Sequence, residues 1–323
     1  MTISSAAERE LTKNEGWRRT DKNNGNAQGR GAPDRRAGST RAGGKAPVKK
    51  KYYRRRHRLT LGTRIFISFI FALLALLLIA VAAYSRGYRY VTVKHNDGGL
   101  VRFAGKIDRD SGKPLGGRLY YSSGAAAKLD ESGERLSYSD GSVYVGELDD
   151  FYREGSGTLT LKNGDEYTGE FKDNVITGKG VYSFSGGDVY EGDLIAGVKE
   201  GTGKYTYANG DVYEGGFSGD LRHGEGKMTW ADGSVYEGGF VFGLKCGKGS
   251  YLYSNGDKYV GDFEDDMRQG EGTYTWAETG ETYTGSFYKN NMHGYGTYTW
   301  QEGRASYTGY FENGKIVAVK PDA

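Results

Sequence analysis

The chain of 323 residues has one cysteine, four prolines and four tryptophans. The single cysteine, Cys246, excludes an internal disulfide and a cysteine-based zinc site. The low proline content and the lack of a triplet period exclude a collagen-like chain, although glycine is abundant at 54 residues. No Asn-x-Ser/Thr acceptor occurs, which favours a bacterial envelope over a eukaryotic secretory lumen. Abundant glycine and tyrosine with little proline indicates many short strands joined by tight turns.

Motifs for catalysis and cofactor binding are also missing. The segment Gly201–Thr206, GTGKYT, lacks the four residues between glycines and the Ser/Thr after lysine that a phosphate-binding loop needs. His223 and His293 share one position of a repeating unit, but they are three units apart and are not expected to converge on a metal. Cys246 occupies the same position, which we expect to be an exposed loop. The carboxylates change position between units, so no pair for acid–base catalysis is indicated. We therefore expect no enzyme activity, no cofactor and no metal site.

Charge is distributed unevenly along the chain. The net charge is +3 overall, but residues 1–58 carry +12, residues 59–143 carry +4 and residues 144–323 carry −13. A basic N-terminal part before an acidic body suggests separate parts with separate partners. The first 50 residues are rich in Gly, Asn, Ala and Arg and have almost no apolar periodicity. We therefore expect residues 1–58 to form a disordered cytoplasmic tail.

One long apolar run, IFISFIFALLALLLIAVAAY, covers Ile65–Tyr84 and lies between Arg64 and Arg86. A helix of this length crosses about 30 Å of hydrocarbon, so the run predicts a single transmembrane helix at 65–85. A buried core helix is a weaker interpretation, because the run has no polar face. A cleaved signal peptide is the stronger competitor, since AVAAYS offers small residues for cleavage. The long basic region before the run favours an uncleaved signal-anchor.

Basic residues gather on the N-terminal side of this run. The membrane-proximal basic cluster consists of Lys49, Lys50, Lys51, Arg54, Arg55, Arg56 and Arg58. Only Arg86, Arg89 and Lys94 lie close on the other side. The positive-inside rule therefore places the N-terminus in the cytoplasm and the C-terminal body on the extracytoplasmic side. The cluster is explained as a topology signal, with binding to anionic lipid as a second interpretation. Nucleic acid is not an expected partner, because no aromatic and basic RNA-binding motif accompanies the cluster.

A tyrosine recurs every 23 or 24 residues through the C-terminal half. The series is Tyr144, Tyr167, Tyr190, Tyr213, Tyr236, Tyr259, Tyr283 and Tyr307. Each is followed two residues later by glycine and four residues later by Leu or Phe, as in Gly215 and Phe217. A pair of glycines and two more apolar residues complete the unit. A period this strict indicates a repeat architecture, with seven full units and one partial unit over residues 144–315.

Each unit is predicted to be a β-hairpin. The segment GKYTYANGDVYEGGF has two alternating apolar runs around Asn209-Gly210, which is a turn signal. Alternation places Tyr213, Gly215 and Phe217 on one face, and Thr206 and Glu214 on the other, toward water. The structural glycines, which let an aromatic ring lie on the backbone, are Gly169, Gly192, Gly215, Gly238, Gly261 and Gly285. The candidate binding face consists of Tyr167, Phe171, Tyr190, Tyr205, Tyr207, Tyr213, Phe217, Trp230, Tyr236, Phe240, Tyr259, Trp276, Tyr283 and Trp300.

The unit resembles the MORN repeat, whose pattern YxGxF followed by GxGxxxxxxG is matched by YEGGFSGDLRHGEGKMTWADG from Tyr213 to Gly233. The resemblance covers residues 144 to about 315. It implies a scaffold or membrane-associated module. The expected fold is all-β: an elongated, twisted antiparallel sheet of stacked hairpins after one transmembrane helix. Some MORN proteins carry a lipid kinase domain, but no residues remain here to form one. We expect degenerate repeats at 86–143 and a tail at 316–323.

Three functions compete at this point. The first is a membrane-anchored module that binds a protein partner, or another copy of itself, through the aromatic and glycine face. The second is phospholipid binding by the repeats, against which the −13 charge of residues 144–323 argues. The third is binding of an envelope glycan, because aromatic rows stack on sugar rings and the predicted topology places them outside the cytoplasm.

Overall fold

The structure is a computed structural model that describes residues 60–300 and 305–317. The predicted tail at 1–58 with its basic cluster, and most of the predicted tail at 316–323, lie outside the described residues.

The apolar run forms one helix, α1 (Leu61–Ser85), four residues longer at its N-terminal end than predicted. Its 25 residues reach about 37 Å, and the helix is long and apolar enough to cross a membrane. No side chain of the helix is buried in the protein, so its apolar surface is not covered by the described residues. The helix ends where Gly87 takes a φ of +90° and donates its N–H to the carbonyl of Tyr84.

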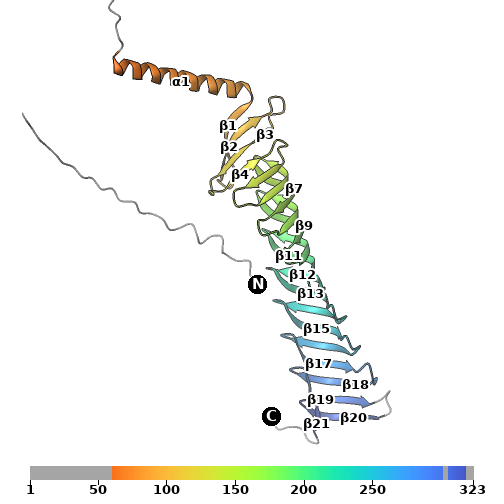
Figure 1. The fold of residues 1–323 in the computed structure, drawn as a ribbon. Helices are drawn as coiled ribbons and strands as arrows, with labels where there is room; N and C mark the ends of the chain where they lie inside the picture. Colours follow the sequence, from red (N-terminus) through yellow and green to blue (C-terminus); the bar gives the residue numbers. More distant parts are fainter. Residues whose placement is uncertain (1–59, 301–304, 318–323) are drawn as a thin grey trace, which may run out of the picture. The chain divides into compact units, whose positions relative to one another are not determined.

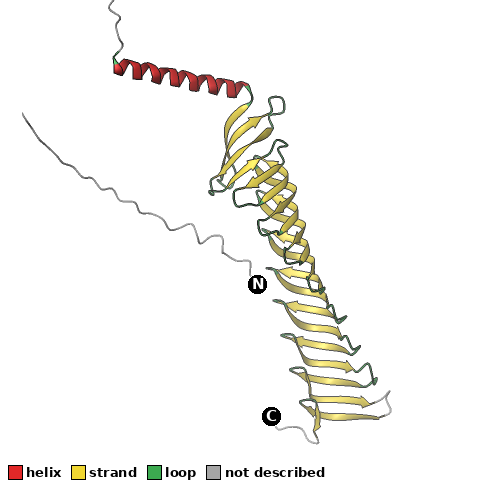
Figure 2. Ribbon diagram, in the orientation of Figure 1, coloured by secondary structure: helices red, strands yellow, loops and turns green. Residues whose placement is uncertain are grey.

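All the other regular elements are strands of one sheet (Figure 2). Their bounds are β1 Tyr88–Lys94, β2 Leu100–Ile107, β3 Pro114–Tyr121, β4 Ala126–Leu129, β5 Arg135–Tyr138, β6 Val143–Asp149, β7 Tyr152–Thr160, β8 Glu166–Lys172, β9 Val175–Ser183, β10 Val189–Ile195, β11 Val198–Thr206, β12 Val212–Ser218, β13 Leu221–Thr229, β14 Val235–Val241, β15 Leu244–Leu252, β16 Lys258–Glu264, β17 Met267–Thr275, β18 Thr282–Tyr288, β19 Asn291–Trp300, β20 Ala305–Glu312 and β21 Lys315–Val317.

Each strand pairs antiparallel with the next one in the chain, from β1 to β21, so the sheet is a continuous meander (Figure 1). The predicted fold of stacked antiparallel hairpins is confirmed. Because every described strand belongs to this one sheet, no second sheet layer covers either face among residues 60–300 and 305–317.

Two kinds of connection alternate along the meander from β6 to β17. The predicted turn at Asn209-Gly210 is confirmed as a three-residue loop, in which Tyr207 N–H donates to the carbonyl of Asp211 over 2.9 Å. Gly210 takes the left-handed conformation, with a φ of +91°, that closes such a loop. The other connection is a two-residue turn, as at Gly219–Asp220, where both residues have positive φ. These two-residue turns were not predicted from the sequence.

The two glycines of each glycine pair have different structural roles. In β13 three residues, His223 to Glu225, lie opposite Gly216 of β12 and form a bulge, in which Gly224 has a φ of +73°. Gly226, two residues later, pairs directly with Gly215. The expectation of a loop just before the pair is wrong, because His223, Cys246 and His293 lie inside β13, β15 and β19, although His223 is exposed as expected. They belong to the unpaired residues of the bulges, and Cys246 is half-buried.

Candidate functional site

A row of fully buried tyrosines runs along one face of the sheet, which we call the aromatic face. The ring of Tyr213 lies on Gly226 of the neighbouring strand, where an added Cβ would come within 2.4 Å of its Oη and 2.6 Å of its Cε2. The Tyr213 hydroxyl donates to the carbonyl of Gly216 over 2.9 Å. The same geometry recurs at Tyr144, Tyr167, Tyr190, Tyr236, Tyr259 and Tyr283, each at most 1% exposed. Glycine is therefore required beneath each ring.

The phenylalanines link these tyrosines from one repeat to the next. Phe217 meets Tyr213 of its own repeat and Tyr190 of the preceding one, each at 5.2 Å between ring centroids and nearly perpendicular. Such edge-to-face pairs stabilise by about 0.5–1.5 kcal/mol beyond their buried area. In β10 a leucine, Leu194, stands at the position where most of the other repeats have a phenylalanine. The core of the array is thus one layer of rings on one face of a sheet.

The structure separates the fourteen residues of the candidate binding face into two groups. Nine are buried and form the core: Tyr167, Phe171, Tyr190, Tyr213, Phe217, Tyr236, Phe240, Tyr259 and Tyr283. The other five, Tyr205, Tyr207, Trp230, Trp276 and Trp300, lie in a second, less buried row. Only this second row offers ring surface to a partner. The role of these residues in binding stays a prediction.

Six half-buried rings of the second row were not on the candidate face. They are Tyr182, Phe184, Tyr251, Tyr253, Tyr274 and Tyr298. Neighbouring rings lie close together, with Trp230 stacked on Tyr251 at 5.2 Å between centroids and Trp276 at 5.2 Å from Tyr298. All six lie two residues from another aromatic residue, as Tyr205 and Tyr207 do, and this spacing places both residues of a pair on one face.

A row of basic side chains lies beside the rings, at the position nine residues after five of the seven core tyrosines. Lys199, Arg222, Lys245 and Arg268 occupy this position in four successive repeats, and Arg153 in the first. Lys245 Nζ lies 5.2 Å from the centroid of Tyr251, and Arg268 Cζ lies 5.0 Å from that of Tyr274. These distances permit cation–π attraction. The row was not predicted, although its members have a constant offset from the tyrosine in the sequence.

The opposite face of the sheet, which we call the polar face, carries aligned charges in its central part. Glu191, Lys204, Glu214, Lys227 and Glu237 follow one another directly across five strands. Alternating charges in cross-strand pairs are favourable, although at an exposed surface each pair contributes little. The expectation that Glu214 faces water is confirmed, because its side chain is 55% exposed.

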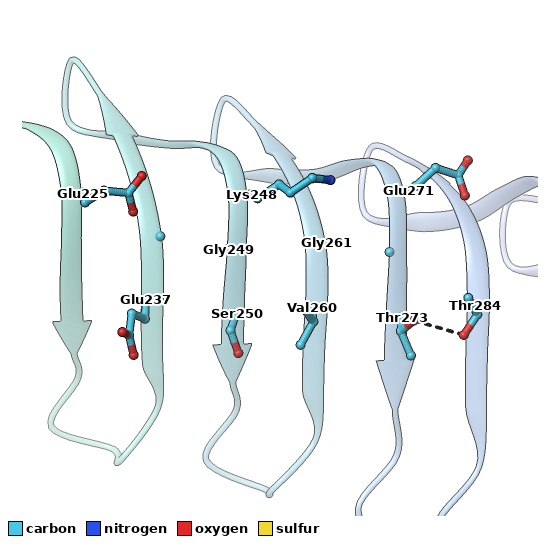
Figure 3. A pocket seen from close by; sticks show the side chains of 12 residues that line it. Glu225, Glu237, Lys248, Gly249, Ser250, Val260, Gly261, Glu271, Thr273 and Thr284 are labelled. Carbon is cyan, nitrogen blue, oxygen red and sulfur yellow. Dashed lines mark hydrogen bonds between the residues drawn. The ribbon is translucent and has the colours of Figure 1, made fainter.

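Beyond Glu237 the same column becomes uncharged and a shallow groove opens on the polar face. The groove has a volume of about 660 Å³ and crosses β13 to β18. Figure 3 shows Glu225, Lys248 and Glu271 along one side of it, and Ser250, Val260 and Thr273 among the residues along the other. Gly249 and Gly261 lie between, and Thr273 and Thr284 hydrogen-bond to each other over 3.0 Å. The groove holds no arrangement of acid and base that would indicate catalysis.

No group of three or more His, Cys, Asp or Glu side chains is placed to hold a metal ion within the described ranges. His223 and His293 lie in strands six apart in the meander, so they do not come together.

Burial of the core tyrosines predicts loss of stability at high pH. Burial raises the pKa of Tyr213 to about 12, although the charge of Arg222 opposes the shift, and burial likewise raises that of Tyr283 to about 12. The folded chain thus keeps protons that an unfolded tyrosine releases near pH 10. The stabilisation that these buried tyrosines give the folded state is fully present below about pH 10 and is lost as the pH rises through about 12. The last part of the rise in tyrosinate absorbance should coincide with the loss of the β-sheet circular dichroism in this window. Completion of the absorbance rise near pH 10 with the strands intact would contradict the prediction.

Seven segments of the chain match the MORN repeat family model. They are residues 144–166, 167–189, 190–212, 213–235, 236–258, 259–279 and 283–303. Each begins at a tyrosine of the buried row. The chain therefore carries seven MORN repeats, as the motif indicates, and their hairpins are those of β6 to β19.

Comparison with curated proteins finds no match to the chain. Two solved structures are similar to it at 11% identity. The TCP10 domain of Danio rerio CPAP in complex with a Danio rerio STIL peptide aligns over 69% of this chain and 100% of that chain, with a TM-score of 0.29. A catalytically inactive virginiamycin B lyase from Staphylococcus aureus with quinupristin aligns over 70% of this chain and 85% of that chain, with a TM-score of 0.16. Neither alignment carries an argument about this chain.

Proposed function

We propose that the protein is a single-pass, membrane-anchored binding module without catalytic activity, which binds a protein partner or a second copy of itself through its aromatic face. Repeats of this family are commonly scaffold or binding modules. In this proposal α1 is an uncleaved anchor, residues 1–58 are a cytoplasmic tail, and residues 144–315 form the binding array outside the cytoplasm. Residues 86–143, which form β1 to β5, connect the two as degenerate repeats.

The observation that carries the proposal is the half-buried second row of rings. Trp230, Trp276, Tyr251 and Tyr253 pack against the core on one side only, and no other layer of the described sheet covers them. Large aromatic side chains that keep exposed surface in a continuous row are typical of interaction sites. The buried core alone would not require this row to be aromatic.

Binding of an envelope glycan is the second candidate, because the same exposed rings suit stacking on sugars. Phospholipid binding by the repeats is less favoured, since residues 144–323 carry a net charge of −13.

Site-specific photo-crosslinking in cells tests the proposed function. A photoreactive amino acid at Tyr253, on the aromatic face, is expected to give a discrete crosslinked protein or a crosslinked dimer of two differently tagged copies. The same amino acid at Lys227, exposed on the polar face, is the matched control. Equal crosslinking from both positions, or none from Tyr253, would refute the aromatic face as the site.

A further inference from the structure

The row of basic side chains limits what the aromatic face can bind. Two of its members already have carboxylate partners: Lys199 Nζ lies 3.0 Å from Asp220 Oδ1, and Lys245 Nζ lies 3.6 Å from Asp266 Oδ1. Arg222 and Arg268 instead donate to turn carbonyls, those of Gly243 over 2.7 Å and Asn290 over 2.6 Å. No carboxylate within the described part of the chain forms an ion pair with either guanidinium.

The arginines therefore keep donors for a ligand. A guanidinium has five N–H donors, and turn carbonyls neutralise none of its charge. In Arg268 the Nη2 group donates to Asn290 and the Nε–H is buried without a hydrogen-bond partner, so the Nη groups carry the donors that a ligand can reach. A half-buried charge next to aromatic rings is a favourable place for a carboxylate, because partial desolvation strengthens the pair and Arg binds carboxylates through two N–H groups. Charge complementarity points to an acidic ligand, although the array as a whole is acidic.

The distance between basic side chains of successive repeats indicates which backbone conformation the ligand has. Corresponding residues of successive repeats are two strands apart, which is about 9.4–9.8 Å across the sheet. A polyproline II helix has three residues per turn and rises about 3.1 Å per residue, so it presents the same face every 9.3 Å or so. A β-strand repeats its face every two residues, at about 6.7 Å, and does not match.

An α-helix fits less well over the length of the row. From Lys199 to Arg268 the row spans three repeats, or about 29 Å. Nine residues of polyproline II cover about 28 Å, whereas three heptads of an α-helix cover about 31.5 Å. The rings provide the second element of recognition, since aromatic-lined surfaces bind polyproline II segments, which lose little conformational entropy on binding.

We propose that the aromatic face across β11 to β17 binds a polyproline II segment of a partner protein that carries an acidic residue at every third position. The carboxylates pair with the basic row, mainly with Arg222 and Arg268, and the residues between them pack on the second row of rings. This inference rests on the proposed function and names the chemistry of the partner.

Binding of synthetic peptides to the full-length protein in detergent tests the inference. The probe is a peptide of Pro-Pro-Glu triplets long enough to cross four repeats, followed by the fluorescence of Trp230 and Trp276. A peptide of the same length and composition, with the glutamates moved out of the three-residue register, is expected to bind about tenfold more weakly. Equal affinity of the two peptides, or tighter binding of an acidic helical heptad peptide, would overturn the inference. So would binding of an acidic polysaccharide when the peptide does not bind.

Paired variants identify the site. Replacing Arg222 and Arg268 by glutamine together is expected to weaken binding of the Pro-Pro-Glu peptide at least about tenfold and to reduce its salt dependence. Lys204→Gln with Lys227→Gln removes the same charge from the polar face and should leave the affinity unchanged. Because the arginines also hold turns, the pair Arg222→Lys and Arg268→Lys is measured too, and it should bind more tightly than the glutamine pair because it keeps the charge, but less tightly than the unchanged protein because it loses the two-N–H contact. Equal losses in the arginine and polar-face glutamine pairs would refute the site. If no peptide binds while Tyr253 still crosslinks a protein, the inference fails and the proposed function stands.

Discussion

Replacing Gly215 by valine is expected to destabilise the array by about 3 kcal/mol or more, the upper range for an overpacked core. An added Cβ at Gly215 would lie 2.6 Å from the Cα of Gly226 and 2.7 Å from the carbonyl oxygen of Glu225. Both are backbone atoms of the paired strand, so they cannot move without opening the ladder. The Tyr213 hydroxyl, also 2.6 Å away, is held by its bond to Gly216. In thermal melting, the expected decrease is roughly 6–12 °C.

The neighbouring residue provides the control for this substitution. Glu214 lies on the polar face, and its pairing with Lys204 at 3.6 Å is solvent-exposed. Glu214→Gln should therefore change the free energy of unfolding by at most about 1 kcal/mol. Similar melting temperatures for Gly215→Val and Glu214→Gln would show that the glycine is not confined beneath a ring.

Labelling of one engineered cysteine from outside the cell is expected to be all or none. In a Cys246→Ser background, Gly186→Cys places a thiol in an exposed loop, where a new Cβ has no atom within 4 Å. If the basic cluster keeps the N-terminus in the cytoplasm, a membrane-impermeant maleimide should label this cysteine in intact cells, or in spheroplasts where an outer layer blocks access. The native Cys246 is a poorer probe, because it is half-buried in β15.

A cysteine at Ser39, in the predicted cytoplasmic tail, is the matched control and should react only after permeabilisation. The reverse pattern would overturn the proposed orientation, and the envelope-glycan alternative with it. Labelling at both positions in intact cells would show that the reagent enters.

Much of the fold could be predicted from the sequence because the residue pattern of each repeat is sufficient to predict its hairpin. Tyr213, Gly215 and Phe217 are spaced for one face of a strand, and Asn209-Gly210 marks a turn. Repetition of this pattern fixes the meander, since a single hairpin cannot bury its apolar face alone. The same reasoning found the apolar helix, because length and hydropathy suffice for that prediction.

The two-residue turns were not predictable in the same way. Asp265–Asp266 and Lys289–Asn290 have no glycine, yet all four residues have positive φ. The paired strands impose this conformation, against the local preference of the residues. Phe151 shows the effect most clearly, since it has a φ of +70° and stacks on Phe103 at 4.8 Å between centroids. Contacts between distant strands decided its conformation.

The candidate site was predicted only in outline, because aromatic residues of both rows look alike in sequence. Tyr213 is buried since two glycines leave room for its ring to lie on the backbone, whereas Tyr205 has no such space and stays half-buried. The basic row was missed because Lys199 and Arg222 follow a turn, where charged residues are ordinary. It is their position over the rings that indicates a role in binding, and the sequence alone does not show that position.

The meander also determines how the array responds to force. Hydrogen bonds of an antiparallel sheet run perpendicular to the strands, so here they run in the direction in which the repeats follow one another. A pull on the last strand of an anchored chain therefore opens one strand pair at a time instead of shearing many together. Each released repeat of 23 residues provides up to about 76–83 Å of extended chain. A partner held at the far end would be on an extensible tether that yields stepwise under load.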